Sequence, residues 1–204
     1  PYELTLNKLG ETDTIVTVIV TAEDKETVKE YTVTIKRPYA TIKGNIYLSA
    51  MSKKGIYKSS IKIFKSEDVA KVVDWSNTKV KSNGDKVHEN LLKVDYKEFQ
   101  TNDDGTYEIK IIPGTYDILF DKPGYLDKVE ASKTVNEGDT LDLGQKGLLF
   151  GDVNKDGIVQ LKDISQICNL YGLSSTDKNY DIKMDANEDG TIQLKDFSEM
   201  QSNY

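Results

Sequence analysis

The chain has 204 residues, of which 30% are charged and 37% hydrophobic, and its net charge is −7. This length allows one large domain or two to three small ones. The acidic balance argues against nucleic acid or an anionic membrane as the main partner, and it suits a protein that binds divalent cations. No apolar run approaches the roughly 20 residues that a membrane helix needs, and the single cysteine, Cys168, excludes an internal disulfide.

Residues 1–37 are predicted to be β-structure, with strands at 15–21 and 28–35 around a polar turn. Two strands alone are only marginally stable in water. We therefore expect this hairpin to pack on the next module or on a missing part of its own domain. Because the sequence begins at Pro1 without an initiator methionine or a signal peptide, we expect it to be a fragment of a longer protein.

The segment VTAEDKETVKEYTVTIKR at 20–37 resembles the C-terminal end of bacterial cadherin-like β-sandwich repeats. Such repeats typically finish with a hairpin of the pattern V-T-A-E-D … Y-T-V-T-I-x-R. The resemblance covers only the end of a repeat. It implies that residues 1–37 are the remnant of a spacer domain without chemistry of its own.

Residues 38–147 are predicted to form a second β-module. Alternating apolar residues predict strands, and a turn at Pro113-Gly114 separates the last two of them; the expected strands are 40–49, 60–66, 106–112 and 115–120. Between the second and third of these strands lies a long polar segment, 67–98. We expect it to be a loop excursion with a short helix at 67–75, because long insertions between strands cost little stability.

The stretch TNDDGTYEIKIIPGTYDILFDKPGYLD at 101–127 resembles the carboxypeptidase-regulatory-like, transthyretin-like β-sandwich family. With the earlier strands the resemblance extends over 40–147, and the insertion at 67–98 departs from it. Modules of this kind sit beside dockerins in cellulosomal scaffoldins, where they are called X modules. The resemblance implies a structural and interface role, without catalysis.

An acidic loop occurs twice in the C-terminal part, as DVNKDGIVQLKD at 152–163 and DANEDGTIQLKD at 185–196. Each copy offers oxygen at positions 1, 3, 5 and 12, with glycine at position 6, which is the spacing of an EF-hand calcium loop. Calcium takes six to eight oxygen ligands, and position 7 can add its backbone carbonyl. We therefore predict two Ca²⁺ ions held by Asp152, Asn154, Asp156, Ile158 and Asp163, and by Asp185, Asn187, Asp189, Thr191 and Asp196.

The remaining loop positions carry further expectations. Gln160 and Gln193 at position 9 could bind the metal through water, and the apolar Val159 and Ile192 at position 8 should pair the loops in the core. The alternative is a turn-rich acidic loop without metal, which two matching copies make the weaker interpretation. Clustered carboxylates repel one another without a cation, so the metal-free form should fold poorly.

Two features depart from an EF-hand sensor. Position 12 is Asp instead of Glu, and the residues before the first loop, LDLGQKGLLF, are typical of a strand rather than an entering helix. Helices are predicted after each loop, at 161–171 and 194–204, each with one apolar face. Two loop–helix (F-hand) units joined by a short middle helix resemble the dockerin family, and the match covers 151–204.

The dockerin resemblance implies that the chain binds a cohesin module of a scaffoldin or cell-surface anchoring protein. In the family, contact residues lie at loop positions 10 and 11 and one to two turns further on. Carried over to this sequence, they are Leu161, Lys162, Ser165, Cys168 and Asn169, and Leu194, Lys195, Ser198, Gln201 and Ser202. The leucine at position 10 resembles type II dockerins, although each leucine could instead pack under its helix. The repeated face suggests that either helix could dock.

The sequence offers little for catalysis. His88 is the only histidine, and its polar surroundings favour a solvated loop residue. Cys168 is expected to be a half-buried small hydrophobe rather than a reactive thiol. Asp103-Asp104-Gly105 is expected to be a hairpin turn, and Trp75 a core or interface anchor rather than part of a sugar-binding face.

We therefore expect a multidomain protein: a cadherin-like remnant at 1–37, an all-β sandwich X-like module at 38–147 and a small all-α dockerin at 148–204. The expected function is non-catalytic, calcium-dependent docking to a cohesin outside a bacterial cell, with no nucleic acid and no membrane insertion. Two rivals remain. One is the calcium-rigidified stalk of a surface adhesin, and the other is the docking tail of a polysaccharide-degrading enzyme whose catalytic module lies elsewhere.

Overall fold

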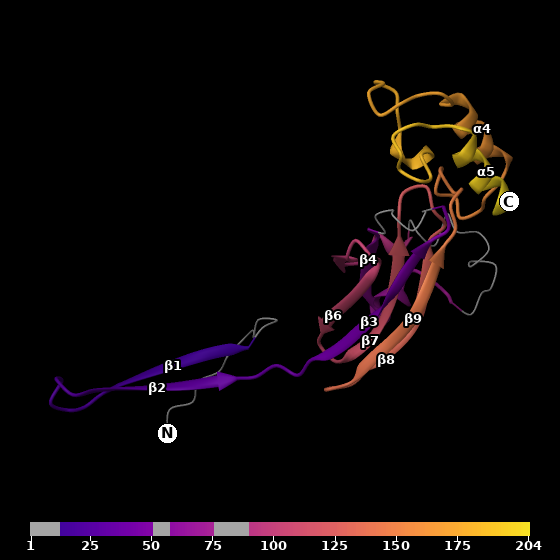
Figure 1. Cartoon of the computed structure of the whole chain (residues 1–204). Coiled ribbons are helices and arrows are strands. Elements are labelled where there is room, and N and C mark those ends of the chain that lie inside the picture. Colours follow the sequence, from indigo (N-terminus) through magenta and orange to yellow (C-terminus); the bar gives the residue numbers. More distant parts are fainter. Residues whose placement is uncertain (1–12, 51–57, 76–89) are drawn as a thin grey trace.

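The computed structural model describes residues 13–50, 58–75 and 90–204. Along the chain, a detached hairpin leads into a β-module and then into a small helical part at the C-terminus (Figure 1). No helix in the described part is both long and apolar enough to cross a membrane. The expectation for His88 falls on a residue outside the described part.

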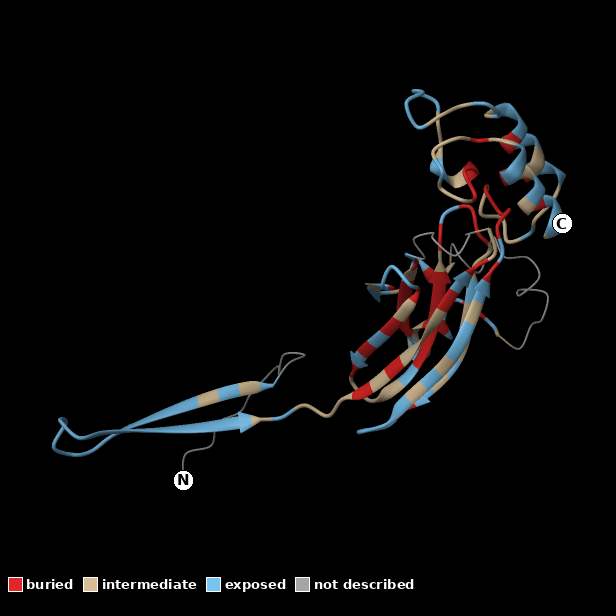
Figure 2. Ribbon diagram, in the orientation of Figure 1, coloured by how far each residue is buried: buried red, intermediate tan, exposed pale blue. Residues whose placement is uncertain are grey.

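The hairpin consists of β1 (Thr14–Thr21) and β2 (Val28–Ile35), which pair antiparallel along their whole length. Both strands lie where the sequence predicts them. Asp24 shapes the turn, because its carboxylate accepts hydrogen bonds from the backbone N–H groups of Glu26 and Thr27 at 3.0 and 2.8 Å. Most hairpin side chains are exposed, and the hairpin stands apart from the β-module (Figure 2). The next module is therefore not its packing partner in the described chain.

Two sheets build the β-module, a name used here for residues 40–148. One sheet has three strands in the order β6-β3-β9, and the other has four in the order β5-β4-β7-β8. All neighbours pair antiparallel except β3 and β9, which are parallel. The strands are β3 (Ala40–Leu48), β4 (Ser60–Lys65), β5 (Tyr96–Gln100), β6 (Thr106–Ile111), β7 (Gly114–Asp121), β8 (Lys128–Val135) and β9 (Thr140–Leu148).

The core of the β-module follows from the two-residue period of its strands. On β3, Ile42, Ile46 and Leu48 are buried, and they share one hydrophobic core with Ile61 of β4 and Phe120 of β7. Successive side chains on a strand point to opposite faces. A register slip of one residue would move this apolar row into water, so the core fixes the pairing of the strands.

The described residues of the insertion at 67–98 include most of a short helix and part of a strand. Helix α1 (Ser66–Val69) is shorter than the helix expected at 67–75, and β5 occupies the end of the segment. The insertion contributes to a second apolar cluster on the other face of the four-stranded sheet, made of Phe64, Val69, Val73, Leu91 and Leu119. Trp75 packs against this cluster, which confirms its expected role as a core anchor.

The turn at Asp103-Asp104-Gly105 differs slightly from the expected hairpin turn. Asp104 Oδ1 accepts a hydrogen bond from Thr106 N at 2.9 Å, and Gly105 has a positive φ of 84°. The turn connects β5 and β6, which belong to different sheets. It therefore passes the chain from one sheet to the other.

The helical part contains α4 (Leu161–Asn169), a single 3-10 turn η1 (Ile182–Met184) and α5 (Leu194–Ser202). Each long helix ends two residues before the sequence predicts. No helix leads into the first acidic loop, because β9 runs directly up to it, as expected. The short middle helix is present as η1.

The β-module and the helical part share one continuous core. The rings of Tyr125 and Phe150 meet edge to face at 5.3 Å, and Tyr125 Oη donates a hydrogen bond to Ala186 O at 2.9 Å. Val153 and Met200 of the helical part belong to the same buried cluster as the strand residues. The short linker thus forms a rigid joint between the two parts.

Candidate functional site

The first acidic loop is wound around the carboxylate of Asp152. Asp156 N donates to Asp152 Oδ1 at 2.9 Å, and Gly157 N donates to Asp152 Oδ2 at 2.8 Å. Asn154 Oδ1 accepts a second bond from Asp156 N at 2.8 Å. The tight winding requires Gly157, whose φ of 79° a residue with a Cβ adopts only at a cost. Three predicted ligand side chains are therefore brought to one loop interior.

Asp163, twelfth in the loop, closes it from the helix side. Its carboxylate accepts bonds from Asn154 N at 3.3 Å and Gln160 N at 3.1 Å. Gln160 in turn caps α4, and its amide donates to Asp156 Oδ2 at 2.8 Å. The position-9 glutamine thus has a structural role that the sequence analysis did not foresee. The start of α4 is tied directly to the loop.

The second loop repeats this network atom for atom at most positions. Asp185 accepts from Asp189 N at 3.2 Å and Gly190 N at 2.7 Å. Asp196 accepts from Gln193 N at 2.9 Å, and Gln193 Nε2 donates to Asp189 Oδ2 at 3.0 Å. The sequence repeat is therefore also a structural repeat.

Position 8 gives each loop an apolar side chain in the same core. Ile192 is fully buried and Val159 packs against the same core. The backbone of Ile192, however, bonds to Gly172 and Leu173, at 2.8 and 2.9 Å. Within the described residues the second loop thus pairs with the segment that follows α4.

Burial disfavours the charged form of several loop carboxylates. Burial raises the pKa of Asp152 from its ordinary value of 3.8 to about 6, and the charge of Asp163 adds to the effect. Burial likewise raises the pKa of Asp163 and of Asp196. A nearby positive charge stabilises the ionised form of such a carboxyl group. A cation in the loops would supply one.

The residues present fit a hard cation that prefers oxygen ligands. The predicted ligands of each loop are three carboxylates, one amide oxygen and one backbone carbonyl, and all of them are hard oxygen donors. Within the described ranges the three aspartates of each loop do not form a close group around one point.

The helices after the loops present the predicted contact residues to solvent. Leu161 is 68% exposed and Leu194 is 65% exposed, so neither leucine packs under its helix. The other eight residues of the predicted faces are exposed as well. Cys168 is exposed, so the expectation that it is half-buried is wrong. The opposite side of each helix is buried through Ile167 and Met200.

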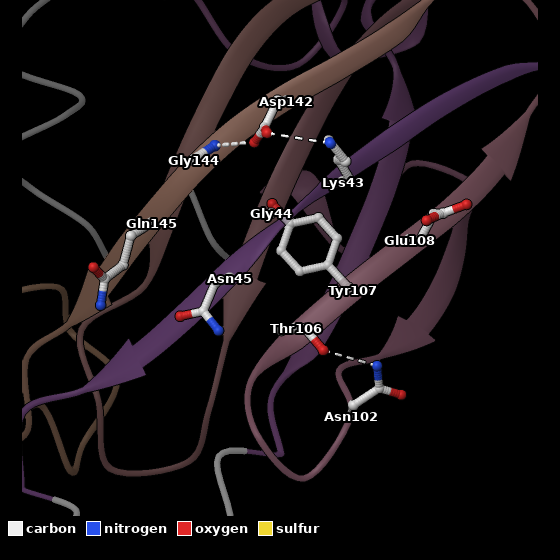
Figure 3. A pocket seen from close by; sticks show the side chains of 10 residues that line it. All are labelled: Lys43, Gly44, Asn45, Asn102, Thr106, Tyr107, Glu108, Asp142, Gly144 and Gln145. Atoms are coloured by element: carbon white, nitrogen blue, oxygen red, sulfur yellow. Dashed lines mark hydrogen bonds and ion pairs between the residues drawn. The ribbon is translucent and has the colours of Figure 1, made fainter.

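A polar pocket with a volume of about 510 Å³ lies on the three-stranded sheet (Figure 3). Its lining includes Lys43, Asn45, Glu108 and Asp142, with the ring of Tyr107 over Gly44. Burial raises the pKa of the Tyr107 hydroxyl, which has no hydrogen-bond partner.

Comparison with known proteins agrees with this geometry. Residues 150–203 match the model of the dockerin type I domain, so the helical part is a dockerin domain. Curated proteins gave no match.

Two solved structures resemble most of this chain. They are interface mutants of a type II cohesin–X–dockerin complex from Acetivibrio cellulolyticus, altered at the N-terminal and at the C-terminal interface. The first has a TM-score of 0.54 at 24% identity, and the second has a TM-score of 0.53 at 22% identity. Each match covers 80% of this chain and 94% of the other. The chain thus has the fold of an X module followed by a dockerin.

Proposed function

We propose that this chain is a non-catalytic docking module that binds a cohesin in a calcium-dependent manner. The observation that carries the proposal is the repeated exposed Leu-Lys pair, Leu161-Lys162 and Leu194-Lys195, at the start of each helix. Each pair occupies positions 10 and 11 of an acidic loop. The two solved structures of similar fold are complexes with a cohesin. The proposed partner is a cohesin of a scaffoldin or of a cell-surface anchoring protein.

Two calcium ions are proposed, one in each loop. The first would be held by Asp152, Asn154, Asp156, Asp163 and the carbonyl of Ile158, and the second by Asp185, Asn187, Asp189, Asp196 and the carbonyl of Thr191. When bound, calcium supplies the positive charge that offsets repulsion among buried carboxylates. The chain's own part is to hold these oxygens in place through the backbone N–H groups described above.

The proposed cohesin contacts are the exposed residues of the two faces: Leu161, Lys162, Ser165, Cys168, Asn169, Leu194, Lys195, Ser198, Gln201 and Ser202. Exposed leucines give a contact surface its apolar centre, and rim lysines act more on association rate than on affinity. A type II-like cohesin is proposed, because a leucine stands at loop position 10 and a β-module precedes the dockerin. The family model that matches is that of the type I domain, so the cohesin panel below includes both types.

The proposed domains are 1–37, 38–147 and 148–204. The two sheets with a shared core support a β-sandwich of the X-module kind for 38–147. The exposed β-branched side chains of β1 and β2 support the end of a larger cadherin-like domain for 1–37. The protein is proposed to act outside a bacterial cell, secreted or at the cell surface.

The rigid joint between β-module and dockerin also fits a second function, a calcium-rigidified stalk of a surface adhesin. Calorimetry against a panel of type I and type II cohesins separates the two proposals. Docking predicts binding to at least one cohesin in calcium and loss of that binding in chelator. If no cohesin of either type bound in calcium, the docking proposal would fail and the stalk would be favoured.

A further inference from the structure

The fourth residue of each acidic loop points out of the loop and contacts the β-module. Lys155 and Glu188 occupy this equivalent position, and both have a positive φ, of 60° and 52°. Neither belongs to the proposed metal ligands. The calcium proposal therefore does not explain why one of these positions carries a positive charge and the other a negative charge.

Lys155 inserts its ammonium group into the turn between β7 and β8. Its Nζ lies 2.7 Å from Asp121 Oδ1 and 2.6 Å from Asp127 Oδ1. It also donates to the carbonyl oxygens of Lys122 and Tyr125, at 3.0 and 2.9 Å. Only 22% of the side chain is exposed. An ammonium has three donors, so four oxygens around it saturate its hydrogen bonds.

Glu188 makes a weaker attachment for the second loop. Its carboxylate pairs with Lys122 Nζ at 2.6 Å, and 27% of its side chain is exposed. No other bond of the Glu188 carboxylate is found in the described residues. The β-module thus holds the first loop through four oxygens around Lys155 Nζ, and the second loop through this ion pair and the hydrogen bond from Tyr125 Oη to Ala186 O. The sequence repeat conceals this difference.

We propose that Lys155 is a positioning residue for the first metal loop. The loop backbone between the ligands Asn154 and Asp156 is fixed by an anchor in the β-module before any metal binds. A pre-organised site binds more tightly, because the entropy of ordering has already been lost on folding. The second loop gains less from its single ion pair. This inference rests on the proposed function, since it concerns the calcium sites of that proposal.

Charge alone predicts the opposite effect of removing Lys155. An ammonium near a calcium site repels the ion, so a neutral residue would strengthen calcium binding. A positioning role predicts that the same neutral residue weakens it. The sign of the change in affinity therefore distinguishes anchoring from simple electrostatics.

The experiment follows the amide signals of Gly157 and Gly190 by NMR during a calcium titration of the full chain. Each amide donates to the first aspartate of its own loop, so each reports one site. Lys155→Met is expected to weaken calcium binding by the first loop roughly ten-fold, as loss of an outer-shell partner does. The second loop should keep its affinity. The matched control, Glu188→Gln, should leave the first loop unchanged.

Asp127→Asn provides a milder variant, because it keeps every loop residue and removes one of the two carboxylate partners of Lys155. It should weaken the first loop in the same direction by a smaller factor. If Lys155→Met lowered the calcium affinity of both loops equally, or left the affinity of the first loop unchanged or raised it, this inference would fail while the calcium proposal would stand. If the amide signals of Gly157 and Gly190 in the wild-type protein did not change on addition of calcium, the calcium proposal itself would fail, and this inference with it.

Discussion

Four carboxylates close the two acidic loops from inside. Asp152, Asp163, Asp185 and Asp196 are each at most 2% exposed, and each accepts backbone hydrogen bonds from its own loop. These bonds shape the loops. Burial disfavours the charged form of Asp152, Asp163 and Asp196, so folding without metal competes with ionisation at these three residues.

The first prediction concerns the pH dependence of the metal-free protein. Burial raises the pKa of Asp152 to about 6 from its ordinary value of 3.8. A raised pKa in the folded state gives stability that is fully present below about pH 4 and is lost as the pH rises through 6. The shift is worth about 3 kcal/mol. Urea unfolding in metal-free buffer should therefore show lower stability at pH 7.5 than at pH 5.

Calcium should reverse this trend, because protons compete with the metal for the same carboxylates. Asp152→Asn, which cannot ionise, should remove the dependence that Asp152 contributes in metal-free buffer. Groups with a lowered pKa, such as Asp121 beside Lys155 and Lys62, lose their contribution only below their ordinary value of 3.8 and so do not interfere. A metal-free protein whose stability rises from pH 5 to 7.5 would contradict this prediction.

Residues whose role is local could be predicted from the sequence, and residues whose role is tertiary could not. The loop glycines and aspartates act within twelve residues of one another, so their spacing identifies them. Lys155 meets Asp121 and Asp127 across 34 and 28 residues. The only local signal for Lys155 and Glu188 is that the fourth residue of each acidic loop is charged. This signal does not identify the residue with which either one pairs.

Among the elements, the turn between β7 and β8 connects the β-module to both loops. Gly124 in this turn has a φ of 83°, and a Cβ there would clash with Lys183 O in the dockerin. Gly124→Ala should therefore destabilise the joint by both strain and a clash. Gly138 offers a matched control, since its φ is 77° and a Cβ would meet nothing within 4 Å.

Urea unfolding of the two variants separates the two effects. Gly138→Ala should cost only the strain of a positive φ, about 1 kcal/mol. Gly124→Ala should cost roughly 1–3 kcal/mol more, as overpacking in a tight contact does. If the two variants lost the same free energy of unfolding, the close approach of the turn to the dockerin would add nothing to the cost of the substitution.

The two helices present similar faces, which leads to a prediction about docking. Changing Leu161 and Lys162 together to alanine should leave cohesin binding within a few-fold of wild type, because α5 still offers its face. The same should hold for Leu194 and Lys195. Only the variant with all four changes should lose roughly ten-fold or more in affinity, as loss of the apolar centre of an interface does. Calorimetry in calcium measures this, and abolition by one pair alone would show a single docking mode.

Strands with a clear apolar pattern were predictable, and the edge strands β5 and β8 were not. The strands β3 and β6 bury alternate residues, β7 buries a continuous run, and all three were expected close to their observed bounds. Strand β5 is mostly exposed and lacks such a pattern. It exists because it pairs with β4 across the insertion. Its pairing partner is distant in sequence, so no local signal marks it.

The whole molecule combines a detached hairpin with a β-module and dockerin that share one core. Ionic contacts reinforce this core at the joint: Asp121 binds Lys62 of its own sheet at 2.6 Å and Lys155 of the dockerin at 2.7 Å. Asn203, at the end of α5, donates a hydrogen bond to Ser49 Oγ, next to β3, at 3.3 Å. The dockerin is thus held to the β-module at its first loop, its second loop and its last helix.

The last prediction follows from this shared core. Residues 148–204 alone should be less stable than 38–204 in the presence of calcium, because Tyr125 and its neighbours no longer cover Phe150. Losing that cover should cost on the order of 3 kcal/mol, the value of burying one or two large side chains. Tyr125→Ala in the full chain provides a milder version that keeps the chain intact. Thermal unfolding in calcium measures both, and equal midpoints for the short and long chains would show that the dockerin folds independently of the β-module.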